Sequence, residues 1–251
     1  MGTSSKLQPT YAVLDVETTG KDPTCDVVVE IGACLYRDGL RIATFETLVN
    51  PERPIPASAS GIHHIRDRDV VGAPKIQDAL RALSDFVADA SVYVAHNADF
   101  DAKFLLDLPA RPWLCTLRLA RHLWPSADDF KNQTLRYYLD VDDADLTGVL
   151  SHRALADTFV TAGILCKALD QLRVTVGQRS LQWLLAYARR PIEVATMPRG
   201  NASTKGKSWS ELTDRDLWYW LGREDLDQDL RWNTEQELYI RLADSICGNA
   251  A

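Results

Sequence analysis

Runs of apolar and β-favouring positions, separated by polar turn residues, predict a β-sheet in the first fifth of the chain. Segments 11–19, 26–36 and 40–49 are rich in β-favouring residues, and an Arg-Asp-Gly turn separates the second from the third. An Asp-Gly pair between two such runs is typical of a hairpin. We therefore expect an antiparallel meander of three strands, followed by a proline-containing loop over residues 51–61.

Apolar residues recur at helical spacing in much of the chain that follows. Over residues 76–87 they occupy positions 76, 79, 80, 83, 86 and 87, which is the period of an amphipathic helix. A helix is also expected to start near Asp67. Further strands are expected at 92–95 and 112–115, and further helices at 98–108, 116–123, 133–139 and 152–172. A meander followed by alternating short strands and helices predicts a mixed α/β sheet with helices packed on it.

The chain beyond residue 175 differs in composition. Five of the seven tryptophans lie there, together with a Gly/Ser/Lys-rich loop over 197–208. Helices are expected over 178–190, 211–221 and 233–247. Because large aromatic residues stabilise folded cores, we expect a small helical module over 176–251. A main domain over 10–175 and a disordered N-terminus over 1–9 would precede it.

Composition and charge narrow the class of protein. The 251 residues are 46% hydrophobic and 25% charged, as in an ordinary globular protein, and the formal net charge is −7. The five cysteines are scattered without a Cys-x-x-Cys pair, and no apolar run is long enough to span a membrane, so a cytoplasmic protein is expected. An acidic chain does not coat nucleic acid by bulk electrostatics, but it is compatible with an enzyme whose carboxylates bind metal ions.

Two carboxylates stand out in the first predicted strand. Asp15 and Glu17 are two positions apart, so their side chains project from the same face. Like charges this close together on a mostly apolar strand are costly unless a cation neutralises them, and divalent cations prefer carboxylate oxygens. Taken alone, the motif also fits two surface acids at a fraying strand end.

A second group of polar residues follows the predicted strand at 92–95. Asn97 is expected to cap the helix behind it. Asp99 has Lys103 four residues further on, which is the spacing of an exposed ion pair. Asp101 instead shares a helix face with apolar residues at spacings of three, four and seven, so it lies on the side that packs inward. Asp101 is therefore favoured over Asp99 as a metal ligand.

A third group opens the predicted helix at 152–172. Ser151 can cap this helix, and Asp157 lies well inside it among apolar residues. Five residues correspond to about 140° of rotation, so His152 and Asp157 do not share a helix face. His152 can still turn toward a site that Asp157 lines and move a proton while Asp157 binds metal. A solvent-exposed histidine without a chemical role is the alternative.

The three groups together resemble the motifs of the DnaQ-like, or DEDDh, 3′→5′ exonucleases. These motifs are Asp15-x-Glu17, His96-Asn-x-x-Phe-Asp101 and His152-x-Ala-x-x-Asp157, in the family's order. The resemblance implies a ribonuclease-H-like fold, two Mg²⁺ or Mn²⁺ ions, and His152 as the general base. The metal ligands that it implies are Asp15, Glu17, Asp101 and Asp157. The implied reaction releases mononucleotides from DNA 3′ ends during repair, recombination or proofreading.

Phosphodiester hydrolysis suits this set of residues. Two metal ions about 3.5–4 Å apart activate a water and cover the attacking and leaving oxygens. A histidine accepts a proton readily near neutral pH. The candidate substrate contacts are Thr18, His63 and Asn97, although Thr18 fits a simple turn residue equally well. His63 belongs to a Gly-Ile-His segment that also resembles the family.

Several other functions and roles stay open. An exoribonuclease trimming RNA 3′ ends would use the same residues, because none of them reads the sugar. A non-catalytic nucleic-acid-binding adaptor would keep the fold, and a metal-dependent phosphatase would share the chemistry. The tail resembles the extension of exonuclease X-type members from Met197 onward, and its Trp218 and Trp220 either form a small core or stack on bases. Scattered basic residues either form a phosphate-steering rim or solvate a face; they are Arg118, Arg121, Lys131 and Arg136.

Overall fold

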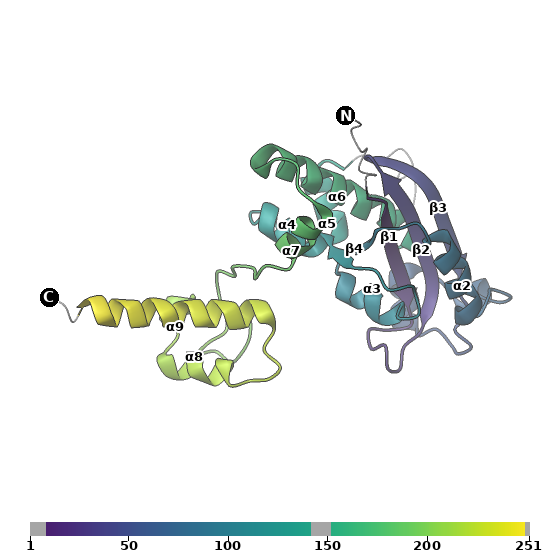
Figure 1. The fold of residues 1–251 in the computed structure, drawn as a ribbon. Coiled ribbons are helices and arrows are strands. Elements are labelled where there is room, and N and C mark those ends of the chain that lie inside the picture. Colours follow the sequence, from purple (N-terminus) through teal and green to yellow (C-terminus); the bar gives the residue numbers. More distant parts are fainter. Residues whose placement is uncertain (1–8, 142–151, 249–251) are drawn as a thin grey trace, which may run out of the picture. The chain divides into compact units, whose positions relative to one another are not determined.

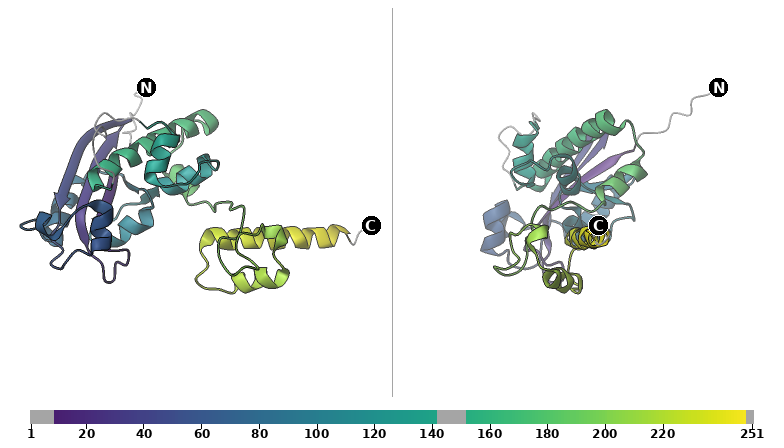
Figure 2. Two further views of the ribbon diagram at one scale, coloured as in Figure 1. Left: turned by 180° about the vertical axis from the view of Figure 1, so that it is seen from behind. Right: turned by 90° about the vertical axis from the view of Figure 1, so that its left-hand side faces the viewer.

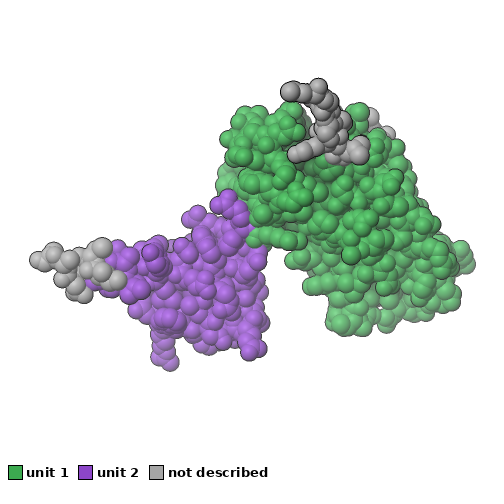
Figure 3. All heavy atoms as spheres, viewed as in Figure 1, with its two compact units in different colours: residues 1–189 green, residues 190–251 purple. Residues whose placement is uncertain are grey.

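The computed structural model describes residues 9–141 and 152–248 of the chain. It divides into two compact units, residues 1–189 and 190–251 (Figure 3). The first unit includes helix α7 (Leu181–Ala188), which lies beyond the boundary at residue 175 that composition suggests. Among the described residues, none of the helices combines the length and the apolar character that crossing a membrane requires.

A five-stranded mixed sheet forms the centre of the first unit (Figure 1). Its strands are β1 (Tyr11–Thr18), β2 (Val28–Arg37), β3 (Leu40–Leu48), β4 (Val92–Ala95) and β5 (Trp113–Cys115). The first three form an antiparallel meander, β4 pairs parallel with β1, and β5 pairs parallel with β4. The spatial order is β3-β2-β1-β4-β5. The predicted meander and mixed sheet are confirmed.

Helices flank this sheet at positions close to those that the sequence predicts. They are α1 (Ala57–His63), α2 (Ile76–Phe86), α3 (Ala98–Phe104), α4 (Thr116–Leu123), α5 (Asn132–Tyr138), α6 (Ala154–Val176) and α7. The predicted loop over 51–61 is wrong at its end, because α1 begins at Ala57. The prolines lie before this helix, where a missing N–H costs nothing, and Pro56 is its N-cap.

Two other predicted helices are shorter than expected. The segment near Asp67 forms only a 3₁₀ turn over Asp67–Asp69. Helix α3 ends at Phe104 instead of Leu108. Pro109 disfavours the helical conformation of Leu108, so the predicted end at Leu108 was unfavourable.

Alternate residues of the sheet face two separate cores. Val13 of β1 packs with Val160 and other residues of α6, whereas Leu14 packs with Leu83 and other residues of α2. Because side chains alternate along a strand, the odd-numbered residues of β1 face α6. Two apolar positions on this face are followed by Asp15 and Glu17, so the strand carries its carboxylates out of the core toward the start of α6.

The second unit is a small helical module with its own core. Helix α8 (Asp214–Leu221) lies beside α9 (Gln228–Gly248), and a 3₁₀ turn at Trp209–Glu211 precedes them (Figure 2). The buried residues are Met197, Leu212, Leu217, Trp220, Leu226 and Leu230. Trp220 therefore belongs to the core, with 7% of its surface exposed, whereas Trp218 is 64% exposed.

The packing of α6 on the sheet leaves no room for a side chain at Gly32 of β2. A Cβ atom built at Gly32 would lie 2.3 Å from the backbone carbon of Ala154, the first residue of α6. Backbone cannot yield as the end of a flexible side chain can. Glycine at position 32 thus permits the close approach of the helix that carries Asp157.

We expect Gly32→Ala to lower the free energy of unfolding by about 1–3 kcal/mol, because the added methyl group overpacks the contact with α6. Gly61→Ala is the matched control. Gly61 lies in α1, and a Cβ atom there meets nothing within 4 Å. Urea denaturation of both variants tests this, and equal stability of the two would show that α6 does not depend on the approach at Gly32.

Candidate active site

The candidate site lies where β1 and β4 end. These strands are parallel, so their carboxyl ends meet at one edge of the sheet. Asp15 and Glu17 come from the end of β1, and Asp101 from α3, which follows β4. Asp157 lies in the first turn of α6, whose start packs against the neighbouring β2. The structure thus brings together the four carboxylates that the motifs single out.

Asp101 is fixed against the strand that bears the other two acids. Only 2% of its surface is exposed, and its Oδ1 accepts a hydrogen bond of 3.2 Å from the backbone N–H of Val16. Val16 stands between Asp15 and Glu17, so this bond places Asp101 beside both. Asp99 is exposed on the outer side of α3.

Asp157 is oriented by hydrogen bonds to both of its carboxylate oxygens. Gln133 Nε2 of α5 donates to Oδ1 at 2.7 Å, and the backbone N–H of His152 donates to Oδ2 at 3.1 Å. The sequence did not single out Gln133. Through this amide, α5 supports the position of Asp157.

His152 precedes α6 and is exposed to solvent. Its φ of 63° is in the left-handed region, and the backbone N–H that this turn presents is the one that bonds Asp157. Ligand atoms of Glu17, His152 and Asp157 all lie within 4.8 Å of one another. The expected cap Ser151 lies outside the described residues. The helix itself begins at Ala154, so His152 approaches the acids from a turn instead of from the helix surface.

Glu30 of β2 is a fifth carboxylate that the sequence analysis missed. It is fully buried, lies opposite Glu17 in the strand pairing, and bonds Arg153 Nε at 2.9 Å. Its Oε2 also accepts the backbone N–H of Ala154 at 2.8 Å. A carboxylate at a helix N-terminus is favourable, so Glu30 caps α6 from the sheet. A lone acid within an apolar strand, two positions before Gly32 on the same face, was the available signal.

The cluster is electrostatically strained. Burial, followed by repulsion from neighbouring carboxylates, raises the pKa of Glu17 to about 8 and holds the pKa of Asp15 well above its usual value. Burial also raises the pKa of Asp101 to about 8, and that of Asp157 above its usual range. A positive charge at this site would relieve the repulsion between the carboxylates. Their oxygen atoms are ligands of the kind that divalent cations prefer.

The three candidate substrate contacts have different surroundings. The Thr18 hydroxyl donates to the backbone oxygen of Gly20 at 2.6 Å, which fits the alternative of a turn residue. His63 is only 1% exposed, and its Nδ1 accepts the Ile65 N–H at 3.1 Å. Burial lowers the pKa of His63. The Nε2 atom of His63 is buried near the backbone of Thr18. No described residue forms a hydrogen bond with it that meets the geometric criteria.

Asn97 does not cap α3 in the expected way. It occupies the N-cap position with φ 75°, but its side chain makes no capping bond and is exposed. The left-handed backbone turns this side chain away from the N–H groups of the helix. Asn97 therefore lies at the strand end with its amide available to solvent.

His96 connects the elements around the site. Its Nδ1 lies 2.9 Å from Thr116 Oγ1, at the start of α4, and its Nε2 lies 2.7 Å from the backbone oxygen of Phe130, just before α5. Burial lowers the pKa of His96. With both ring nitrogens engaged, His96 holds β4 to the segment that carries Gln133.

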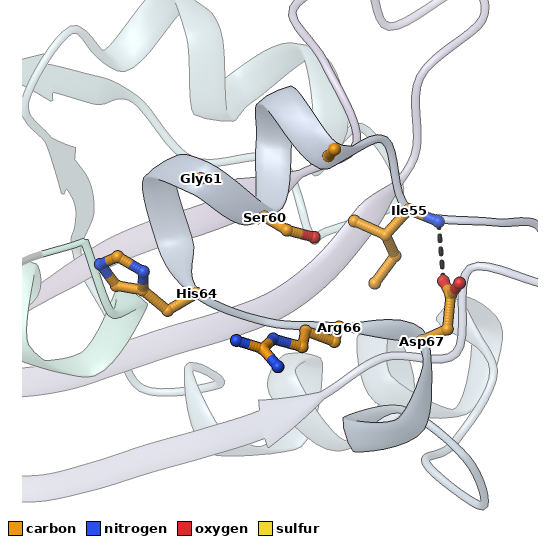
Figure 4. A pocket seen from close by; sticks show the side chains of 7 residues that line it. Ile55, Ser60, Gly61, His64, Arg66 and Asp67 are labelled. Atoms are coloured by element: carbon orange, nitrogen blue, oxygen red, sulfur yellow. Dashed lines mark hydrogen bonds between the residues drawn. The ribbon is translucent and has the colours of Figure 1, made fainter.

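A pocket lies beside α1 (Figure 4). Its lining residues are Ile55, Ala57, Ser60, Gly61, His64, Arg66 and Asp67. Asp67 Oδ1 accepts the backbone N–H of Ile55 at 2.8 Å across one end. The pocket and the acidic cluster share no residue.

The sequence and fold place the chain among known proteins. A model of the exonuclease family matches residues 12–165, a range that contains Asp15, Glu17, Asp101, His152 and Asp157. The chain belongs to this family. The DnaQ-like resemblance, the ribonuclease-H-like fold and the assignment as an exonuclease are thereby confirmed.

Individual relatives differ in how much of their length matches. Exodeoxyribonuclease 10 of Escherichia coli (strain K12) is 32% identical over 211 residues, which cover 83% of this chain and 89% of the relative. DNA polymerase III PolC-type of Bacillus subtilis (strain 168) is 36% identical over 216 residues, but these span only 14% of that protein. The structure of exonuclease X in complex with 5′ overhanging duplex DNA aligns with a TM-score of 0.59 and 30% identity, covering 71% of this chain and 99% of that one.

We expect Glu30→Ala to lower the free energy of unfolding by about 3 kcal/mol, because Arg153 and the Ala154 N–H both lose a buried acceptor. Glu30→Gln keeps an acceptor for Ala154 and should lose less. Glu46→Ala is the control, since Glu46 Oε1 lies 3.6 Å from an Arg153 guanidinium nitrogen but the Glu46 side chain is exposed. Exposed ion pairs contribute less than about 1 kcal/mol to the free energy of unfolding. Chemical denaturation decides: similar losses at positions 30 and 46 would contradict the capping role.

The stability of the metal-free protein should depend on pH. The pKa values of Glu17 and Asp101 are higher in the folded protein than in the unfolded chain, so between about pH 4.5 and 8 the folded state binds more protons. The free energy of unfolding therefore falls as the pH rises through this range. Divalent cations should raise the melting temperature more at pH 8 than at pH 6. Calorimetry with and without chelator measures both effects.

Asp15→Asn should stabilise the metal-free protein by about 1–2 kcal/mol at pH 8, because it removes one of the repelling charges. Asp99→Asn, on the exposed side of α3, is the control and should change little. A destabilised Asp15→Asn protein would mean that the cluster carries no unfavourable charge in the absence of metal.

Proposed function

We propose that this chain is a metal-dependent 3′→5′ exonuclease that removes mononucleotides from DNA 3′ ends. The observation that supports this most strongly is the convergence of Asp15, Glu17, Asp101 and Asp157 at the carboxyl ends of β1 and β4. Membership of the exonuclease family supplies the reaction class.

The four carboxylates would hold divalent cations, for which we propose two Mg²⁺ or Mn²⁺ ions. When bound, such ions supply an activated water and neutralise charge on the phosphate oxygens. The protein contributes the arrangement of the ligands: Val16 orients Asp101, and Gln133 orients Asp157. Because these supports are backbone and amide groups, they orient the carboxylates without neutralising them.

His152 is the proposed general base. It lies beside Glu17 and Asp157 and is exposed, so it can accept the proton of the attacking water and pass it to solvent. The left-handed turn and the bond from its N–H to Asp157 hold the residue at the mouth of the cluster.

DNA is the proposed substrate on the basis of the relatives. One relative is named exodeoxyribonuclease 10, and the exonuclease X structure contains duplex DNA. An exoribonuclease and a non-catalytic adaptor are the alternatives that the experiment separates. The cytoplasm is the proposed location. The cysteines among the described residues that form no disulfide support it; they are Cys25, Cys34, Cys115 and Cys166.

We expect purified protein with Mg²⁺ or Mn²⁺ to shorten 5′-labelled DNA from its 3′ end, and chelator to abolish the ladder. His152→Ala should lower the rate by about 10²–10⁴, the usual contribution of a general base. Asp101→Ala should abolish activity, whereas Asp99→Ala, two residues away on the exposed side of α3, should keep it. Denaturing gels of the labelled products measure the rate of shortening for the wild type and the three variants.

Parallel substrates decide between the alternatives. Faster digestion of RNA than of single-stranded or duplex DNA would favour the exoribonuclease. If the wild type binds every polymer and shortens none with either metal, the catalytic proposal is wrong and the adaptor takes its place.

A further inference from the structure

Two stretches of 20 or more residues in this acidic chain contain no acidic residue. They are residues 108–127 and 171–192, which carry seven arginines between them, although 35 of the 251 residues are Asp or Glu. The first contains α4 and the second contains α7. A local excess of positive charge on a protein of net charge −7 indicates a surface for an anionic partner.

The fold brings the two stretches together. Arg118 Nε of α4 donates a hydrogen bond of 2.8 Å to the backbone oxygen of Ala188 in α7. The rings of His122 and Tyr187 meet with centroids 5.2 Å apart. Helices α4 and α7 therefore lie side by side in the first unit (Figure 1).

This surface presents flat side chains in a row. The Arg179 guanidinium lies 5.6 Å from the centroid of the Trp183 ring, and Trp183 stacks on Tyr187 at 5.0 Å with an interplanar angle of 18°. Tyr187 then meets His122. All these side chains are partly or fully exposed, as is Arg121 nearby. We call Arg121, His122, Arg179, Trp183 and Tyr187 the arginine–aromatic face.

The arginine–aromatic face continues toward the carboxylate cluster. Arg121 lies over the ring of Phe130 at 5.6 Å, and the backbone oxygen of Phe130 contacts His96. Three residues further on, Gln133 bonds Asp157. A strand leaving the site along this segment would reach Arg121 first and the aromatic row next.

We infer that the arginine–aromatic face binds the single-stranded part of a DNA substrate, on the 5′ side of the bond that is cut. Aromatic planes accept bases of any sequence, and arginines contact the phosphates between them. The Arg179 contact with Trp183 is an exposed cation–π pair, weaker than base stacking, so an incoming base can replace it. The inference rests on the proposed function, because it assigns a subsite to that substrate.

The test is the affinity of the full chain for a 5′-fluorescent single strand of about 20 nucleotides, measured by anisotropy in EDTA so that no hydrolysis occurs. We expect the double variant Arg121→Glu, Arg179→Glu to raise the Kd at least tenfold. The slope of log Kd against log salt should fall by about 0.7 for each phosphate that the variant no longer neutralises. Both side chains are exposed, and unchanged melting temperatures would show that the fold is intact.

Lys75→Glu with Arg81→Glu is the matched control. It makes the same change in net charge at two exposed positions, the N-cap of α2 and a residue within α2, on the other side of the sheet. It should leave the Kd within twofold. Trp183→Ala, like the double arginine variant, should raise the Kd for the single strand. Trp183→Phe should keep most of the wild-type affinity, because it keeps an aromatic ring.

Three results would overturn the inference. The first is that the wild type does not bind the single strand. The second is that the Arg121→Glu, Arg179→Glu variant has the same Kd as the wild type. The third is that the α2 control loses as much affinity as that variant does. If the wild type binds a labelled poly-glutamate peptide and the face variant loses only that binding, the partner is an acidic protein. Failure of the proposed function would appear differently, as a wild type that binds the strand but does not shorten it with Mg²⁺.

Discussion

The close approach of α6 to β2 is the contact on which the candidate site depends. Gly32 removes the side chain that would block it, and Glu30 bonds both Arg153 and the first N–H of the helix. His152 and Asp157 lie at this helix start. If α6 shifted by the width of a methyl group, their positions relative to β1 would change. The geometry of the site is therefore set by backbone packing and a buried cap outside the set of metal ligands.

The same arrangement concentrates negative charge that the fold alone does not neutralise. Four carboxylates meet at one edge of the sheet, with Glu30 close behind them, and Arg153 forms its direct ion pair with Glu30. Asp101 and Asp157 are oriented by N–H donors from backbone or amide groups. Protons relieve the repulsion in the metal-free protein, whereas cations do so in a working enzyme. The carboxylate cluster therefore lowers the stability of the metal-free fold at the site that is proposed to bind cations.

Charge is also distributed unevenly over the rest of the first unit. A net charge of −7 argues against contact with a polyanion when it is averaged over the chain. The acid-free stretches in α4 and α7 show why the average misleads, because packing joins them into one surface. The anionic cluster and the cationic face lie on either side of the segment that contains Phe130 and Gln133.

The meander, the helix periods and the inward side of α3 could be predicted from the sequence, because strand and helix periods are local properties. The family could be predicted too, since three short motifs in order carry that information. Tertiary structure decided what local periods cannot show: that Glu30 caps α6, that Gln133 orients Asp157, and that α4 and α7 share a surface. Each of these hydrogen bonds joins residues at least 24 positions apart, and only strand pairing and helix packing bring such residues within reach of one another.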